Sequence, residues 1–275
     1  MSWVVVVPVK GNPGAKTRLG GPGPGRAELA DAFALDTVAA LLAAAPVLGV
    51  FVVTGDPVLG GELARLGAHI VPEAKGARDA VRTGPVANDS SGTDAGHPFT
   101  GSSPGDRGDP GDPGDRGDRG DRGDPGDPGD PLNEAIDVGL AAAAAAFPAA
   151  HRAVVTGDLP ALTAADVERA LALAGEHERS FVPDSDDTGT TTLLALAGVP
   201  ITPRFGPGSR AAHEAAGHIP LALPARTGIR RDVDTPADLA LAERLGAGPH
   251  TSALLGAASA RSPVTVPSED RPLEK

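Results

Sequence analysis

Short runs of β-branched and aliphatic residues alternate along the chain with longer segments whose apolar residues recur at helical spacing. Four consecutive valines at 4–7 form the first run, and such an unbroken apolar run is typical of a strand buried on both faces. Further strands are predicted at 50–54, 68–71, 153–156, 181–183, 190–196 and 219–223, and helices at 26–45, 58–66, 132–146, from 163 onward, 209–216 and 236–245. This alternation predicts a three-layer α/β domain with a largely parallel, mixed sheet.

Two segments break the pattern. Between Gly105 and Pro131 a Gly-Asp-Pro or Gly-Asp-Arg triplet repeats nine times, within a Gly/Pro/Asp-rich stretch at 84–131. A collagen triple helix also has glycine at every third place, but proline never stands second in these triplets. We therefore expect a single domain over 1–246, interrupted by a disordered insertion at 84–131, and a disordered tail at 247–275.

Charge and composition argue against several classes of function. The net charge of −12 argues against a nucleic-acid-binding surface, although seven of these charges come from eleven Asp against four Arg within 84–131. The absence of cysteine excludes disulfides and thiol nucleophiles. With neither a signal-peptide pattern nor an apolar run of membrane-spanning length, the sequence predicts a cytoplasmic protein that contacts no membrane.

The loop after the four valines carries the first candidate chemistry. It holds two glycines and three cations, Lys10, Lys16 and Arg18. Ligands of open α/β sheets bind beyond the carboxyl ends of strands, and clustered cations there neutralise phosphate. An ordinary solvated loop is the alternative interpretation.

Two acidic elements follow. Asp158 comes directly after a predicted strand, and Asp232 and Asp234 flank a valine, so that both carboxylates are expected on one face. Carboxylates at strand ends suit Mg²⁺, which takes few protein ligands and shares the rest with phosphates and water. Turn formation by Asp158 and helix capping by the later pair are the alternatives, although Thr235 can serve as that cap.

Hydroxyl-rich and glycine-rich segments form the last candidate element. Thr188-Gly-Thr-Thr-Thr192 enters a predicted strand, and Arg204-Phe-Gly-Pro-Gly-Ser-Arg210 leads into a predicted helix. Hydroxyls and main-chain amides could hold a carboxylate or phosphate there, and a plain tight turn is the alternative. The seven histidines show no metal-ligand spacing and are interpreted as surface or packing residues.

Six motifs follow one another along the chain: Val-Pro-Val-Lys…Ala-Lys-Thr-Arg-Leu, Leu-Asn-Glu-Ala, Thr-Gly-Asp-Leu-Pro, Gly-Thr-Thr-Thr, Arg-Phe-Gly-Pro-Gly-Ser and Asp-Val-Asp-Thr-Pro. In this order they resemble the motifs of the phosphoenolpyruvate/2-phospho-L-lactate guanylyltransferases of coenzyme F-420 biosynthesis. The resemblance covers about residues 3–246 apart from the insertion. It implies the nucleotidyltransferase version of the Rossmann-like fold, which is similar to that of glycosyltransferases of the A type.

The resemblance also implies roles for individual residues, with GTP and phosphoenolpyruvate as substrates and Mg²⁺ as cofactor. The triphosphate would contact Lys10, Lys16 and Arg18, and Asn133 would lie near the guanine. The metal would be held by Asp158, Asp232 and Asp234, and the acceptor by Thr191, Gly206 and Ser209, with the threonine's register uncertain by one. Lys16, Arg18 and Asp158 would carry the catalysis.

Other interpretations stay open. The acceptor could be 2-phospho-L-lactate, or the chain could be a sugar-phosphate or molybdopterin nucleotidyltransferase, a glycosyltransferase, or an interaction protein built around the triplets. The family resemblance also suggests the downstream transferase that uses the guanylylated product as a possible partner.

Overall fold

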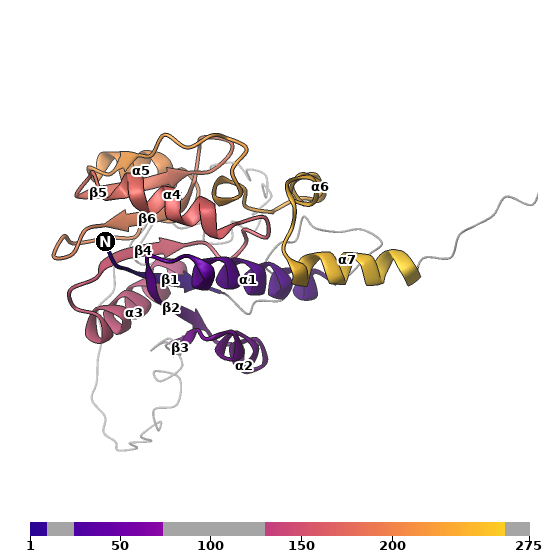
Figure 1. The fold of residues 1–275 in the computed structure, drawn as a ribbon. Coiled ribbons are helices and arrows are strands. Elements are labelled where there is room, and N and C mark those ends of the chain that lie inside the picture. Colours follow the sequence, from indigo (N-terminus) through magenta and orange to yellow (C-terminus); the bar gives the residue numbers. More distant parts are fainter. Residues whose placement is uncertain (10–24, 74–129, 262–275) are drawn as a thin grey trace, which may run out of the picture. The chain divides into compact units, whose positions relative to one another are not determined.

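A computed structural model describes residues 1–9, 25–73 and 130–261 (Figure 1). The loop predicted to carry Lys10, Lys16 and Arg18 lies outside the described residues, as does most of the predicted insertion. The last two residues of that insertion are described, and they belong to the fold. Asp130 caps the helix α3, which begins at Pro131, because its Oδ1 accepts the amide of Leu132 at 2.7 Å.

Within these described ranges, seven strands form one mixed sheet in the order β3-β2-β1-β4-β6-β5-β7. Their bounds are β1 Trp3–Pro8, β2 Val47–Thr54, β3 His69–Pro72, β4 His151–Val155, β5 Arg179–Pro183, β6 Thr190–Ala195 and β7 Ile219–Pro220. The four valines occupy the central β1 and are completely buried. β1 pairs in parallel with β2 and β4, whereas β6 runs antiparallel to both β4 and β5. The predicted largely parallel, mixed sheet is confirmed.

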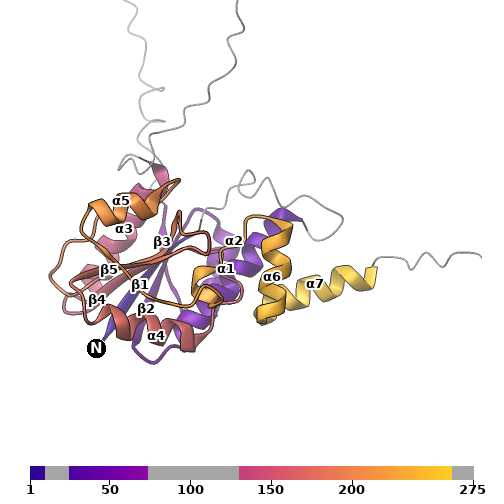
Figure 2. The same cartoon turned by 90° about the horizontal axis from the view of Figure 1, so that it is seen from above.

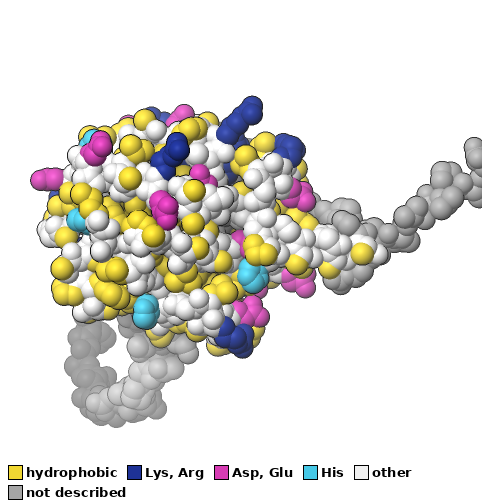
Figure 3. All heavy atoms as spheres, viewed as in Figure 1, with side chains coloured by type: hydrophobic (Ala, Val, Ile, Leu, Met, Phe, Trp, Pro, Cys, Tyr) yellow, Lys and Arg dark blue, Asp and Glu magenta, His cyan; other side chains and the backbone are white. Residues whose placement is uncertain are grey.

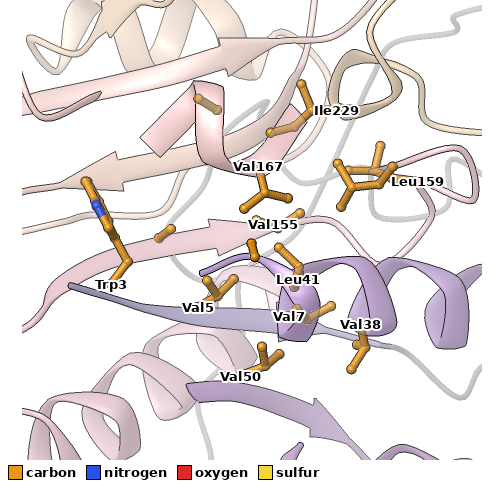
Figure 4. Packing of buried hydrophobic residues seen from close by; sticks show 14 of the residues in the cluster. Trp3, Val5, Val7, Val38, Leu41, Val50, Val155, Leu159, Val167 and Ile229 are labelled. Atoms are coloured by element: carbon orange, nitrogen blue, oxygen red, sulfur yellow. The ribbon is translucent and has the colours of Figure 1, made fainter. Parts of the chain in front are cut away.

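Helices cover both faces of the sheet (Figure 2). Residues of α1 (Arg26–Ala43), α2 (Pro57–Leu66) and α4 (Ala164–Ala174) pack in one core on one face (Figure 4). Residues of α3 (Pro131–Ala146) contribute to a second core on the opposite face, where α5 (Ser209–Ala215) also lies. The 3₁₀ turn η1 (Gly228–Arg230) precedes α6 (Pro236–Leu245). The expected three layers are therefore present.

α3 approaches the sheet closely at Gly139. A Cβ atom there would lie 2.5 Å from Cγ1 of Val6 and 2.7 Å from Cγ2 of Val53, closer than carbon atoms normally approach. Glycine weakens an isolated helix, so its presence in an otherwise alanine-rich helix is explained by this contact with β1 and β2.

The predicted disordered tail at 247–275 is wrong for its first part. Residues Pro249–Arg261 form a helix, α7, that packs against α1. Asp36 of α1 is buried and accepts the main-chain amides of His250 at 2.9 Å and Thr251 at 2.8 Å. A side chain from α1 thus satisfies two free amides at the start of α7. The remaining residues, 262–275, lie outside the described part.

Other differences concern boundaries. The predicted strand at 219–223 is only two residues long, and β2 begins at Val47 rather than at residue 50.

On the face shown in Figure 3, basic and acidic side chains lie among apolar and uncharged ones without a large patch of one sign. Within the described ranges, no helix has the length and apolar character to cross a membrane.

Candidate functional site

The predicted site residues that the structure describes gather mainly along one edge of the sheet. The parallel strands β4 and β5 end there and continue into Asp158 and Asp184, and the antiparallel β6 begins there with Thr190. The main-chain amide of Thr156 donates to the carbonyl of Thr191 at 2.9 Å, which ties the segment before Asp158 to the start of β6. The carboxyl end of β1 reaches the same edge, because β1 runs parallel to β4.

The turn that carries Asp158 is held from two sides. The Leu159 amide donates to the hydroxyl of Thr37, a completely buried residue of α1, at 3.1 Å. On the other side, a Cβ at Gly157 would lie 3.3 Å from the carbonyl oxygen of Pro8, at the end of β1. Asp158 is partly exposed between these anchors. The role of Thr37 was not predicted, because its partner lies 122 residues away in the sequence.

The second acidic element lies directly beside the first. The Val233 amide donates to the Asp158 carbonyl at 3.1 Å, and the Val233 side chain is completely buried. Thr235 caps α6, as predicted, by accepting the Asp238 amide at 3.3 Å. The cap therefore does not require the carboxylates of Asp232 and Asp234, which flank Val233.

The carboxylates of this edge influence one another. Burial raises the pKa of Asp232 to about 7, and the negative charges of Asp158, Asp234 and Asp184 add to the effect. Such repulsion is what a bound cation would relieve, so these residues fit a divalent metal. Within the described ranges no cluster of three or more acidic or histidine side chains is arranged to hold a metal alone. Mg²⁺ needs only one or two carboxylates when phosphates supply other ligands.

The three threonines at the start of β6 differ in their contacts. Thr190 Oγ1 lies 2.9 Å from Nδ1 of His213, whereas Thr191 Oγ1 donates to the carbonyl of Ile229 at 2.6 Å. The hydroxyl of Thr192 is buried and forms no hydrogen bond with any residue that the structure describes. The pairing of β6 with β5 shifts register here, which is typical of a bulge.

The glycine-rich turn leads into α5 beside the start of β6. Gly206 and Gly208 have φ of 127° and 73°, a backbone conformation that favours glycine. Ser209 is buried, and its Oγ would lie 3.7 Å from a Cβ at Gly189. Of the predicted acceptor residues, Ser209 thus lies close to the loop that leads into β6, where Thr191 stands.

Asn133 was predicted to lie near the guanine. The structure places this residue in the first turn of α3, completely buried, with its side-chain amide against the main chain of Phe205. Its Oδ1 accepts the Phe205 amide at 2.9 Å and its Nδ2 donates to the Phe205 carbonyl at 3.2 Å. The predicted contact with the base remains a prediction.

One arginine and two aspartates that sequence reasoning missed shape the loop between β5 and β6. Asp184 accepts the amides of Thr188 at 2.9 Å and Gly189 at 2.8 Å. Arg230 is buried and donates to the Asp184 carbonyl and to the carboxylate of Asp187 at 2.8 Å. These contacts hold the loop that leads into Thr190, and nothing in the local sequence pattern indicates them.

The sequence of the chain is similar to those of known enzymes over nearly its whole length, although no family model matches it. It is 39% identical over 264 residues to a phosphoenolpyruvate guanylyltransferase of Thermomonospora curvata, covering 96% of this chain and 92% of the relative. It is 38% identical over 273 residues to the enzyme of that name from Streptomyces avermitilis, covering 98% of this chain and 100% of the relative.

A solved structure supports the fold. A nucleotide-diphospho-sugar transferase from Desulfovibrio desulfuricans superposes with a TM-score of 0.56 at 18% identity, covering 94% of this chain and 96% of that one. At this identity the likeness concerns the fold alone, and it confirms the predicted nucleotidyltransferase-type architecture. The two bacterial relatives confirm the resemblance of the motifs: the chain belongs to the phosphoenolpyruvate guanylyltransferase family.

Proposed function

We propose that this chain transfers the guanylyl group of GTP to the phosphate of phosphoenolpyruvate, giving enolpyruvyl-diphospho-5′-guanosine and pyrophosphate. Family membership supports the reaction class. The single structural observation that carries the proposal is the hydrogen bond from Val233 to Asp158, because it joins the two acidic elements at the edge where the threonine strand begins.

The reaction asks for placement and charge compensation rather than for a base. A phosphate monoester loses its second proton near pH 6, so the acceptor is already nucleophilic at neutral pH. One of its oxygens forms a bond to the α-phosphorus of GTP, while the bond from that phosphorus to the bridging oxygen breaks and pyrophosphate leaves. The lack of a cysteine in the chain is compatible with this route.

Asp158, with Asp232 or Asp234, would hold Mg²⁺. The metal, when bound, neutralises charge on the triphosphate and on the leaving pyrophosphate. Lys10, Lys16 and Arg18 are proposed to bind the same phosphates from the loop after β1, and Lys16 and Arg18 to stabilise the charge that develops in the transition state. Thr191, Gly206 and Ser209 are proposed to bind the three-carbon acid.

The nearest alternative acceptor is 2-phospho-L-lactate, which differs by two hydrogens. Incubation of the enzyme and Mg²⁺ with each nucleoside triphosphate and each acceptor, with pyrophosphate measured, separates the candidates. We expect pyrophosphate from GTP with phosphoenolpyruvate, and little from ATP, CTP or UTP. Release of pyrophosphate with a sugar 1-phosphate, and none with either three-carbon acid, would refute the proposal.

The family resemblance extends the proposal to a pathway. We propose that the product enters coenzyme F-420 biosynthesis in the cytoplasm, where a downstream transferase consumes it. Loss of F-420 fluorescence in a strain that lacks this enzyme, restored by the intact gene and not by an Asp158→Asn variant, is the expected result.

A further inference from the structure

His213 joins two parts of the proposed acceptor site. It lies one turn after Ser209 on α5 and is completely buried. Its Nε2 accepts the main-chain amide of Arg204 at 3.1 Å, at the start of the glycine-rich turn. Its Nδ1 lies 2.9 Å from the hydroxyl of Thr190, at the start of β6.

These contacts determine where the imidazole carries its proton. A main-chain amide can only donate, so Nε2 must be the acceptor and Nδ1 must carry the hydrogen. Burial, together with His218 and Arg204, lowers the pKa of His213 to about 3, so the ring is neutral at working pH. Nδ1–H therefore donates to Thr190, and the hydroxyl proton of Thr190 is directed elsewhere.

Thr191 has the opposite arrangement. Its hydroxyl proton is donated to the carbonyl of Ile229 at 2.6 Å. An anion is bound by donors, so a hydroxyl whose proton is already directed at a carbonyl contributes less than one whose proton is available. Among the hydroxyls of 190–192, Thr190 is thus the one whose orientation is fixed while no described residue accepts its proton, which stays available for a ligand.

Asn133 holds the same turn from α3. Both ends of its amide bond the main chain of Phe205, the residue after Arg204. The rings of Phe205 and His213 also pack edge to face, with centroids 5.4 Å apart. Two side chains from two helices therefore anchor two consecutive residues directly before Gly206.

We propose that His213 and Asn133 are positioning residues of the acceptor site, which hold the turn before Gly206, and that His213 orients the Thr190 hydroxyl to donate to the anionic acceptor. This inference rests on the proposed function, and it shifts the hydroxyl donor from Thr191 to Thr190. It also gives Asn133 a role toward the acceptor rather than toward the nucleotide.

Steady-state kinetics with each substrate varied in turn tests the hydroxyl. Thr190→Val should raise the KM for phosphoenolpyruvate by about tenfold to a hundredfold, as expected for a lost hydrogen bond to a charged group, and leave the KM for GTP within about threefold. Thr190→Ser, which keeps the hydroxyl, should restore most of the acceptor affinity. A selective rise in acceptor KM in Thr191→Val instead of Thr190→Val would overturn the assignment.

Two substitutions of His213 separate its two contacts. The carboxamide of His213→Gln can reach the Arg204 amide in place of Nε2, whereas that of His213→Asn stays near the position of Nδ1. Hydrogen exchange of the 203–209 amides should therefore accelerate in His213→Asn and in Asn133→Ala but not in His213→Gln. Leu63→Ala, a cavity in α2, is the control for general destabilisation and should not accelerate exchange at this turn selectively.

The same variants connect the anchors to catalysis. Asn133→Ala should raise the KM for phosphoenolpyruvate more than that for GTP, and a rise confined to GTP would overturn its role toward the acceptor. Unchanged exchange in an active enzyme would refute the anchors and leave the proposed function standing. A wild-type enzyme that forms no product from phosphoenolpyruvate would refute the proposed function, and the exchange experiment would still decide on the anchors.

Discussion

At the scale of single residues, the proposed metal site depends on Asp158 and its neighbours. The segment that bears Asp158 is fixed by Thr37 and by its hydrogen bond from Val233, so the carboxylate has a defined place at the sheet edge. Asp158→Asn keeps the shape and removes the charge. We expect turnover to fall by roughly two to four decades, because several kcal/mol of charge stabilisation are lost. Turnover close to wild type in a folded variant at saturating Mg²⁺ would contradict the metal assignment.

The carboxylate of Asp232 should lower the stability of the metal-free protein at high pH. Its pKa is raised from 3.8 to about 7, so the folded state prefers the protonated form. The corresponding stability is complete below pH 3.8 and is lost as the pH rises through about 7. Without metal, Asp232→Asn should therefore be more stable than the wild type at pH 8 by roughly 1–3 kcal/mol, and the difference should shrink toward pH 5.

Thermal unfolding with and without Mg²⁺ checks this prediction for Asp232. In the presence of GTP, Mg²⁺ should raise the Tm of the wild type more than that of Asp232→Asn. A variant that is less stable than the wild type at pH 8 without metal would show that burial and the repulsion by neighbouring carboxylates do not destabilise the ionised Asp232 significantly.

At the scale of elements, the local sequence pattern predicted correctly those features of the fold whose stabilising contacts are local. The four valines predicted β1, and the cap at Thr235 was predicted from a sequence that supplies both partners within three residues. α7 was missed because its anchor, Asp36, lies more than 200 residues away, and α7 itself has a weakly apolar pattern. The contacts of Asn133 were invisible for the same reason, since Phe205 lies 72 residues away.

The packing of α3 on the sheet gives a prediction at this scale. Gly139→Ala should destabilise the protein by roughly 1–3 kcal/mol, because overpacking against Val6 and Val53 outweighs the gain in helix propensity. Gly61→Ala in α2 is the matched control. Among the described residues, no atom outside the chain neighbours and the backbone of α2 lies within 4 Å of a Cβ there, so this variant should be stabilised by up to about 1 kcal/mol. Urea unfolding of both variants measures the difference, and equal effects would contradict the packing argument.

At the scale of the whole molecule, the strands of the sheet and the helices on its two faces belong to the described residues, whereas residues 84–129 lie outside them. Replacing 84–129 with a short Gly/Ser linker should leave folding and turnover intact, because loop length has a weak effect on stability. Adding Asp130→Ala to this variant should cost about 1 kcal/mol, since α3 then loses its cap. Loss of folding after the linker replacement alone, seen by circular dichroism, would contradict the prediction.

The proposed transfer of the guanylyl group is tested most directly by following each phosphate of GTP. With GTP labelled at the α-phosphorus, guanylyl transfer predicts that the label appears in a product that forms only when phosphoenolpyruvate and Mg²⁺ are present. With GTP labelled at the γ-phosphorus, the label should appear only in pyrophosphate. Release of GDP, or transfer of the γ-label to the acceptor, would contradict guanylyl transfer at this site.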